Sequence, residues 1–394
     1  MAGPLEGYRI VDLTTMISGP LATMMLGDQG ADVIKVEMPG EGDHVRSYGN
    51  RSGGLSASFL NNNRSKRSIA INLKEAQGRE ILERLVAGAD VFVQNFRPGV
   101  VERLGVDEAA MRRVAPDIVY VSISGFGERG PYASKPVYDP IVQAVSGLAA
   151  IQGGSDANRP RLVRTILPDK LTGVTASQAI TAALLARERG GKGQHVRLSM
   201  LDAVIAFLWA SDMGAQTYVG KTVSAQRAAS FIDLIYETKD GHMSVAVMND
   251  REWAALSGAL ERPEWLEDPR FESSELRDLN IDARLTLTQE VLALRTTDEW
   301  IERLEAAGVP CAAVHSRDRM IENPQVLANE IIVETDHPHA GRLRQARPAA
   351  RFAGTPAASA RGAPLLGEHT DEILDQLGFS QAEIAEFRRA KVIG

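Results

Sequence analysis

Hydrophobic positions in the first half of the chain follow two alternating patterns. Short apolar runs that are typical of buried strands lie at residues 8–13, 32–37, 90–95 and 117–124. Helical spacing of apolar residues lies between these runs, at 21–29, 75–87 and 106–114. Strands that alternate with helices of this length predict parallel crossovers. We therefore expect an α/β fold with an open, mainly parallel, Rossmann-like sheet, and ligands at the carboxyl ends of its strands.

The second half of the chain begins with a confident helical pattern and then changes character. The predicted elements are a helix at 170–190, a strand at 195–198, a helix at 199–212, a hairpin at 234–247, helices at 250–260, 282–293 and 297–307, a strand at 309–314, and a helix near 317–328. Residues 335–365 carry few helix or strand signals and predict a long connection, before a helical hairpin at 370–390. A chain of 394 residues exceeds one ordinary core, so we expect two domains. We place a large α/β domain at 1–222 and a smaller α+β domain at 223–330.

Composition narrows the function classes. The net charge of −7, with no basic stripe, argues against a nucleic-acid partner. Cys311 is the single cysteine, so neither an internal disulfide nor a cysteine-based metal site is expected. We expect no metal, because His337 and His339 lie in the predicted connection with no third ligand nearby and are expected at the surface. The chain shows no signal-peptide pattern and no apolar run of membrane-spanning length, so we expect a cytoplasmic protein without a membrane partner.

A glycine motif and two carboxylates are the candidates for chemistry. Residues 125–130 (GFGERG) match half of a dinucleotide-binding fingerprint, but Pro131 follows at once and argues against the helix that should open there. Asp169 lies at the start of the 170–190 helix, where aspartate is favoured as an N-cap. The same place stabilises negative charge, which would keep the carboxylate ionised and able to attack a carbonyl. Asp12, inside the first strand, is expected to bond the loop that follows it.

Seven stretches, in order along nearly the whole chain, resemble the family III CoA transferases. This CaiB/BaiF-like group includes formyl-CoA transferase and crotonobetainyl-CoA:carnitine CoA-transferase, and α-methylacyl-CoA racemase is a relative. The matching stretches are 9–37, 60–74 (LNNNRSKRSIAINLK), 95–105 (NFRPGVVERLG), 124–132 (SGFGERGPY), 191–203, 238–247 and 366–374 (LGEHTDEIL). The resemblance implies an interlocked homodimer. It also implies that residues 331–394 form a linker and a C-terminal segment that returns to complete the large domain.

The resemblance assigns the chemistry to Asp169, which falls on the nucleophile position of the transferases, with Tyr138 at an active-site tyrosine. It implies that coenzyme A passes from an acyl-CoA donor to a free carboxylic acid through an aspartyl anhydride and thioester, with no tightly bound cofactor. By position, Ile17 and Ser18 should line the site near the thioester. The nucleotide-end and other CoA-binding positions are Asn72, Leu73, Lys74, Asn95, Phe96, Arg97, Arg103 and Lys135.

Departures from the family pattern leave alternatives open. Met38 stands where some formyl-CoA transferases have arginine, and residues 228–232 (AASFI) replace a glycine-rich loop over the active site. The racemases place histidine where this chain has Tyr138, and a tyrosine of ordinary pKa near 10 is a poor partner for proton abstraction. A racemase is therefore the second reading. A non-catalytic protein that binds CoA esters is the third, since fold does not fix function.

Overall fold

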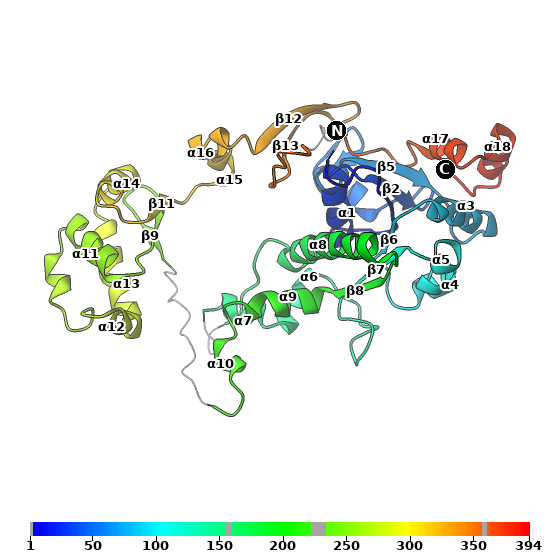
Figure 1. The fold of residues 1–394 in the computed structure, drawn as a ribbon. Helices are drawn as coiled ribbons and strands as arrows, with labels where there is room; N and C mark the ends of the chain where they lie inside the picture. Colours follow the sequence, from blue (N-terminus) through cyan, green and yellow to red (C-terminus); the bar gives the residue numbers. More distant parts are fainter. Residues whose placement is uncertain (1–2, 155–158, 222–233, 357–360) are drawn as a thin grey trace. The chain divides into compact units, whose positions relative to one another are not determined.

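The structure is a computed structural model that describes residues 3–154, 159–221, 234–356 and 361–394 (Figure 1). The chain divides into two compact units. The larger unit holds residues 1–149, 162–213 and 331–394, and the smaller unit holds 150–161 and 214–330. The predicted boundary between residues 222 and 223 lies outside the described residues, and the domain bounds stay a prediction. Among the helices of the described residues, none is long and apolar enough to cross a membrane.

A six-stranded sheet forms the centre of the larger unit. Its strands are, in spatial order, β5 (Lys66–Ala70), β2 (Asp32–Glu37), β1 (Arg9–Asp12), β6 (Val91–Gln94), β7 (Val119–Ser124) and β8 (His195–Ser199). Every neighbouring pair is parallel, which confirms the predicted α/β class. Parallel strands need crossovers, and the alternating helices supply them. All six carboxyl ends therefore lie along one edge of the sheet.

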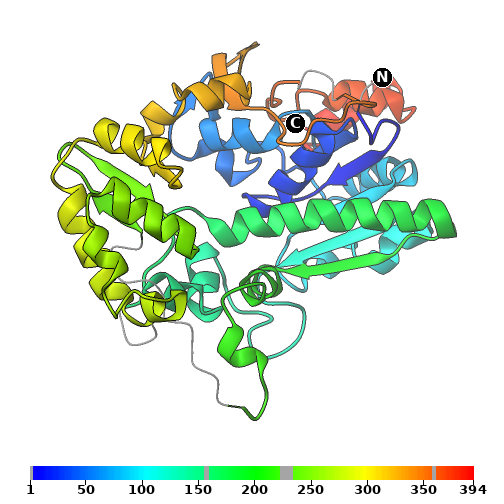
Figure 2. The same cartoon turned by 60° about the vertical axis from the view of Figure 1, so that its left-hand side comes forward.

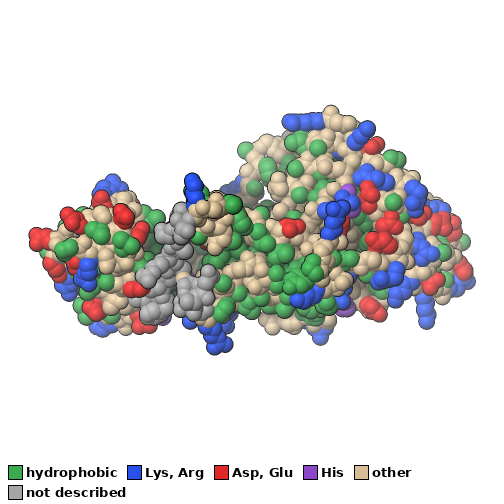
Figure 3. All heavy atoms as spheres, turned by 90° about the horizontal axis from the view of Figure 1, so that it is seen from below, with side chains coloured by type: hydrophobic (Ala, Val, Ile, Leu, Met, Phe, Trp, Pro, Cys, Tyr) green, Lys and Arg blue, Asp and Glu red, His purple; other side chains and the backbone are tan. Residues whose placement is uncertain are grey.

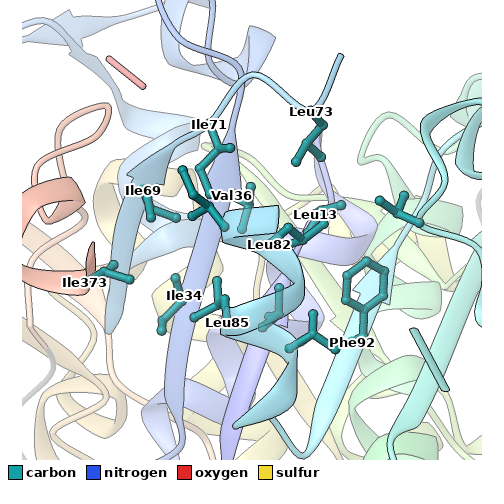
Figure 4. Packing of buried hydrophobic residues seen from close by; sticks show 14 of the residues in the cluster. Leu13, Ile34, Val36, Ile69, Ile71, Leu73, Leu82, Leu85, Phe92 and Ile373 are labelled. Carbon is teal, nitrogen blue, oxygen red and sulfur yellow. The ribbon is translucent and has the colours of Figure 1, made fainter. Parts of the chain in front are cut away.

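Helices cover both faces of this sheet, because alternate side chains of each strand point to opposite faces. The larger unit contains α1 (Ser18–Asp28), α2 (Ala57–Asn63), α3 (Ala76–Ala87), α4 (Val100–Leu104), α5 (Glu108–Val114), α6 (Asp139–Val145), α8 (Leu167–Gly190), α9 (Met200–Trp209), α17 (Thr370–Gln376) and α18 (Gln381–Arg389). Phe92 and Tyr120 belong to one apolar cluster with residues of α3, α5 and α17, and Figure 4 shows Phe92 near Leu82 and Leu85 of α3. Val91 and Val119, one residue away, pack instead with α1 and α8. Figure 2 shows α8 as the long helix that runs along the sheet.

The C-terminal segment packs on the first sheet strands, as predicted. Ile71 pairs with Ile393, and the His369 N–H donates to the Ser68 carbonyl at 2.9 Å. Ile373 lies in the same apolar cluster as Ile34 and Ile69 of the sheet (Figure 4). In Figure 1 the red helix α17 lies beside β5, which is also its contact in the structure.

The smaller unit has a short antiparallel sheet with helices around it. Its strands are β9 (Ile235–Glu237), β10 (His242–Val245) and β11 (Cys311–Ala313), in the order β11-β10-β9. Its helices are α10 (Gly214–Thr217), α11 (Asp250–Ala259), the 3₁₀ turn Pro263–Leu266, α12 (Ser274–Leu279), α13 (Ile281–Leu292), α14 (Thr297–Ala306), α15 (Arg317–Met320) and α16 (Pro324–Ala328), while α7 (Leu148–Gln152) spans the division between the units. The hairpin and the three central helices are confirmed. The helix predicted near 317–328 is two helices, because Asn323 caps a new start at Pro324.

Three other predictions differ from the structure. The long connection contains a hairpin, β12 (Ile332–His337) and β13 (Gly341–Ala346), whose outward side chains are polar and hide the strand pattern. His337 is buried there, with Nε2 at 2.8 Å from the Ala363 carbonyl oxygen, so its predicted surface place is wrong. The helix predicted at 106–114 begins only at Glu108, since Gly105 ends α4 with a φ of 70°. Two short strands, β3 (Arg51–Ser52) and β4 (Leu55–Ser56), and the 3₁₀ turn His44–Ser47 complete the larger unit.

Candidate active site

The loop between β1 and α1 is held by the side chains of Asp12, Asp43 and Asn95. Asp12 accepts the Thr14 N–H at 2.8 Å and the Thr14 hydroxyl at 2.5 Å. Asn95, at the end of β6, accepts the Thr15 N–H at 2.9 Å and donates to the Thr15 carbonyl at 2.8 Å. Asp43 accepts the Met16 N–H at 3.1 Å. The backbone that leads into Ser18, the first residue of α1, is therefore fixed by side chains at the ends of β1 and β6 and by Asp43, the N-cap of the 3₁₀ turn His44–Ser47.

Asp12 has the local bonding role that the sequence predicted. Its side chain is fully buried and also accepts the Thr23 hydroxyl and the Lys66 ammonium, at 2.7 Å and 2.9 Å. Burial by itself would raise the pKa of Asp12, but Lys66 and Lys35 outweigh it and hold that pKa below its usual range. Asp12 is thus a structural anion with no free lone pair for a substrate.

Asp169 lies in the first turn of α8, two residues after its first residue, Leu167. The N-cap is Ile166, so the predicted capping role of the Asp169 side chain is wrong. The Asp169 N–H instead donates to the Asp139 carboxylate, at 3.1 Å, across a gap of 30 residues. Asp139 belongs to α6, is 3% exposed, and also accepts the Gln143 side-chain amide at 2.7 Å. Because Asp139 accepts a backbone N–H at the start of α8, the Asp169 carboxyl group is not needed there and can bind other partners.

The Asp169 carboxyl group meets Ser18 at the start of α1. Burial and the nearby Asp139 charge raise the pKa of Asp169 to about 6, while hydrogen bonds from the Ser18 hydroxyl and backbone N–H oppose that rise. The helix start was expected to keep this carboxylate ionised, and burial and Asp139 act against that effect, although the group is still mainly ionised at neutral pH. The group is mainly ionised only above about pH 6, and a more basic carboxylate is a better nucleophile.

A glycine allows α1 and α8 to approach at this point. A Cβ added to Gly173, one turn after Asp169, would lie 2.9 Å from the Ser18 carbonyl oxygen and 3.0 Å from a Leu21 methyl carbon. At Gly190, the last residue of the same helix, an added Cβ would meet no atom within 4 Å. The absence of a side chain at Gly173 thus lets the start of α1, with Ser18, lie close against α8 one turn from Asp169.

We expect Gly173→Ala to lower the transfer rate by about tenfold or more, because the added methyl group moves Ser18 away from Asp169. Gly190→Ala is the matched control, since both changes replace a helical glycine by a better helix former. Steady-state rates and thermal unfolding of both variants measure the effect. Equal activity of the two variants would contradict the close contact as a requirement of the site.

Tyr138 lies next to this carboxylate pair, as the residue before Asp139 and the N-cap of α6. Its side chain is 64% exposed in the single chain. Lys135, in the same loop, lies over the ring of Tyr132 with Nζ 4.4 Å from the ring centre. The loop at Gly125–Gly130 opens no helix, as predicted, since α6 begins only at Asp139.

The remaining predicted positions form three groups, which follow β1, β5 and β6. Ile17 and Ser18 are buried at the start of α1 and belong to the Asp169 site. Asn72, Leu73 and Lys74 follow β5, where the Leu73 and Lys74 carbonyls accept Arg79 of α3 at 3.2 Å and 3.0 Å. Asn95, Phe96, Arg97 and Arg103 follow β6, and the arginines are exposed. β2 and β1 separate β5 from β6 in the sheet.

Sequence reasoning missed Asp139, Gln143, Asp43 and Lys35. The Asp139-Pro140 pair at a helix start was a usable signal, because proline is favoured there and aspartate suits the first turn. The predicted change at residues 228–232 lies outside the described residues. Within the described ranges, no group of three His, Cys, Asp or Glu side chains is placed to hold a metal ion.

Comparison with known proteins shows the family of this chain. The family described as CoA-transferase family III matches residues 5–370. The chain is 35% identical to succinyl-CoA:glutarate CoA-transferase from Homo sapiens, over 99% of this chain and 90% of that protein. It is 31% identical to formyl-CoA:oxalate CoA-transferase from Escherichia coli, over 100% of both. A CAIB/BAIF family protein from Brucella suis has a TM-score of 0.83 at 31% identity, covering 96% of this chain and 100% of that one. The chain belongs to CoA-transferase family III, the family that its sequence resembles.

Proposed function

We propose that this CoA transferase passes coenzyme A through Asp169, which acts as a covalent nucleophile. The observation that carries the proposal is the Asp169 carboxyl group itself. It is partly buried, it has a pKa raised to about 6, and it lies beside Ser18, whose hydroxyl and backbone N–H oppose that rise. A carboxylate that is ionised at neutral pH but poorly solvated is suited to attack a thioester.

The proposed reaction balances with the carboxylate and thioester alone. An Asp169 oxygen attacks the donor carbonyl and expels the CoA thiolate, which leaves a mixed anhydride. The thiolate attacks the aspartyl carbonyl and releases the donor acid, so that Asp169 carries CoA as a thioester. The acceptor carboxylate attacks this thioester and expels the thiolate, which then attacks the acceptor carbonyl and frees Asp169. No ATP is consumed, because each step exchanges one activated acyl bond for another.

Ser18 is the proposed source of charge stabilisation in these steps. Each attack creates a negative oxygen, and a preorganised N–H or O–H donor stabilises such an oxygen in a site from which water is partly excluded. Ser18 is 5% exposed and its backbone is fixed by the loop described above. Its donors therefore need little reorganisation in the two attacks on the aspartyl carbonyl, where charge develops on an oxygen of Asp169. We propose that Tyr138 contacts the acyl group.

For the CoA moiety, we propose that Ile17 and Ser18 border the thioester. Lys74, Arg97, Arg103 and Lys135 supply cations for the phosphates, since the ammonium and guanidinium groups bind phosphate by charge. The path of the CoA arm between the thioester and the phosphates is lined by Asn72, Leu73, Asn95 and Phe96. The side-chain amide of Asn95 is occupied by Thr15, so we propose that Asn95 acts by shaping the loop.

The acceptor is proposed to be a short dicarboxylic acid. The relatives named above are a succinyl-CoA:glutarate CoA-transferase and a formyl-CoA:oxalate CoA-transferase, and both names include a short dicarboxylic acid. We further propose a cytoplasmic homodimer without a tightly bound cofactor. Exposed apolar side chains on α8 and α9 (Leu185, Phe207 and Trp209) would suit burial against a second copy. Figure 3 shows hydrophobic side chains, in green, at the surface of the larger unit.

The test is trapping of the acyl-enzyme. The protein is incubated with succinyl-, acetyl- and formyl-CoA in turn, quenched with hydroxylamine and mapped by peptide mass spectrometry. We expect a hydroxamate at Asp169, formed more slowly as the pH falls through about 6, where the carboxylate takes up a proton.

Other outcomes separate the alternatives. Binding of CoA esters with no adduct from any donor would contradict the covalent route. Deuterium entering the α-carbon of an acyl-CoA from solvent, without an acceptor acid, would then indicate a racemase. Binding with neither reaction would indicate a non-catalytic protein.

A further inference from the structure

We propose that Asp43 is a positioning residue of the transfer reaction, which fixes Met16 in a left-handed conformation and thereby aims Ser18 at Asp169. The inference rests on the proposed role of Asp169. Asp43 contacts neither the nucleophile nor the predicted CoA positions, and nothing in its sequence context suggested a role. Its contacts with the β1–α1 loop carry the argument.

The buried side chain of Asp43 has two sets of partners, backbone N–H groups at one oxygen and a lysine at the other. It is 1% exposed, and one carboxylate oxygen accepts the Met16 N–H at 3.1 Å and the Val45 N–H at 3.1 Å. The other oxygen lies 3.1 Å from the Lys35 ammonium, which is fully buried. A buried carboxylate is tolerable only when it is paired, and the Lys35 ammonium beside the second oxygen provides that pairing while the first oxygen holds the loop.

Lys35 contacts the same loop directly. Its ammonium donates to the Thr14 carbonyl at 2.7 Å, two residues before the Met16 N–H that Asp43 accepts. The Asp43 backbone is held in turn, because its N–H donates to Glu37 at 2.9 Å and Glu37 pairs with Arg46 at 2.6 Å. The Asp43–Lys35 pair thus links the end of β2 to both sides of the turn before α1.

Met16 is the residue that needs such a restraint. Its φ is 70°, a left-handed conformation that costs a non-glycine residue about 1 kcal/mol or more. It lies two residues before Ser18, whose N–H and hydroxyl reach Asp169. If Met16 relaxed to a negative φ, the backbone after it would turn and those donors would leave the nucleophile. Strain that the surroundings maintain beside a reactive group is typical of preorganised sites.

The test compares two double variants that both remove the buried lysine. Lys35→Met/Asp43→Asn keeps an oxygen for the Met16 N–H, while Lys35→Met/Asp43→Leu does not. We expect kcat of the leucine variant to fall at least about tenfold below that of the asparagine variant, with a smaller change in KM for acyl-CoA. The apparent pKa on the acid side of the kcat–pH profile (the acid limb) should also be higher in the leucine variant, by about half a pH unit or more. The reason is that Asp169 loses hydrogen bonds to its ionised form.

That shift in the acid limb is the readout that a merely structural role would not produce. The groups around Asp169 are Asp139 on α6, Ser18 on α1, and Lys170 on its own helix, whose ammonium bonds Thr165 at 2.7 Å. None of them is changed in either variant. Equal acid limbs in the two folded variants would overturn the inference.

A second pair of variants keeps the inference testable if the leucine variant does not fold. Met16→Gly and Met16→Ala lose almost the same side chain, but only glycine adopts a positive φ without strain. We expect the glycine variant to unfold at a higher temperature than the alanine variant, and the reverse order would overturn the claim that Met16 is restrained.

The failure of this inference can be told from the failure of the proposed function. Hydroxamate at Asp169 in the unaltered protein, together with equal acid limbs in the two double variants, would refute this inference alone. Absence of the hydroxamate would refute the proposed function instead.

Discussion

Replacing Asp169 by asparagine is expected to lower the rate of CoA transfer by a factor of about 10³ or more, because an amide cannot form the anhydride and thioester. The substitution keeps the shape of the side chain and an oxygen that accepts from Ser18. The Asp169 N–H that Asp139 accepts also remains. Steady-state transfer with a saturating donor measures the effect. Transfer within tenfold of the unaltered protein would contradict the nucleophilic role.

The same variant should be more stable than the unaltered protein at pH 8. The pKa of Asp169 is about 6 when folded, against about 4 in an unfolded chain. Between these values the unfolded chain has released the proton while the folded state still holds it. The folded state therefore loses stability as the pH rises from 4 to 6, and the full cost remains above 6. Because Asp169 is partly exposed, the effect is smaller than the full pKa difference implies. We expect Asp169→Asn to raise the free energy of unfolding by about 1–2 kcal/mol at pH 8 and by almost nothing at pH 4.

Urea unfolding at the two pH values tests this difference. Asp202, an exposed aspartate in the first turn of α9, provides the matched control. Asp202→Asn removes a favourable charge from a helix start, so it should lose a few tenths of a kcal/mol at pH 8. If Asp169→Asn lost stability at pH 8 as this control does, the ionised Asp169 carboxylate would stabilise its helix, and it would not lower the stability of the folded protein. A catalytic group that costs stability is the expected trade-off.

The predictable part of this site comes from local patterns. Regular alternation of strands and helices predicts the parallel sheet, and the sheet places the loops after β1, β5 and β6 on one edge. Asp169 could be found because it begins a long helix and falls on a family position. These signals depend on residues close together in the chain.

The unpredicted part depends on residues that are distant in sequence. β5 was not predicted because its sequence, KRSIA, begins with two cations that are buried through pairing with Asp12 and Asp32. The pKa of Asp169 depends on Asp139, and the conformation of Met16 depends on Asp43. A hydrophobic pattern treats such charges as exposed, so it cannot predict which of them are buried together.

Removing the Asp12 carboxylate is expected to destabilise the larger unit by about 3–5 kcal/mol, because it leaves a buried lysine unpaired. The Lys66 ammonium is fully buried and donates to Asp12, Asn63 and the Pro20 carbonyl, all within 2.9 Å. Asp12→Ala therefore leaves the Lys66 ammonium without its counter-ion, and it also removes the acceptor of the Thr14 and Thr23 hydroxyl groups. Urea unfolding at pH 7 measures the loss.

The double variant Asp12→Asn/Lys66→Met separates the charge from the hydrogen bonds. It removes both ions together, and a neutral replacement of a buried pair is often close to harmless. We expect it to recover more than half of the stability that Asp12→Ala loses. Because Asp12 has a folded pKa below its unfolded value, the contribution of the pair is present above about pH 4 and is lost as the pH falls. The gap between Asp12→Ala and the unaltered protein should therefore narrow in acid. A gap independent of pH, with no recovery in the double variant, would mean that Asp12 stabilises the loop by its hydrogen bonds and not as the counter-ion of Lys66.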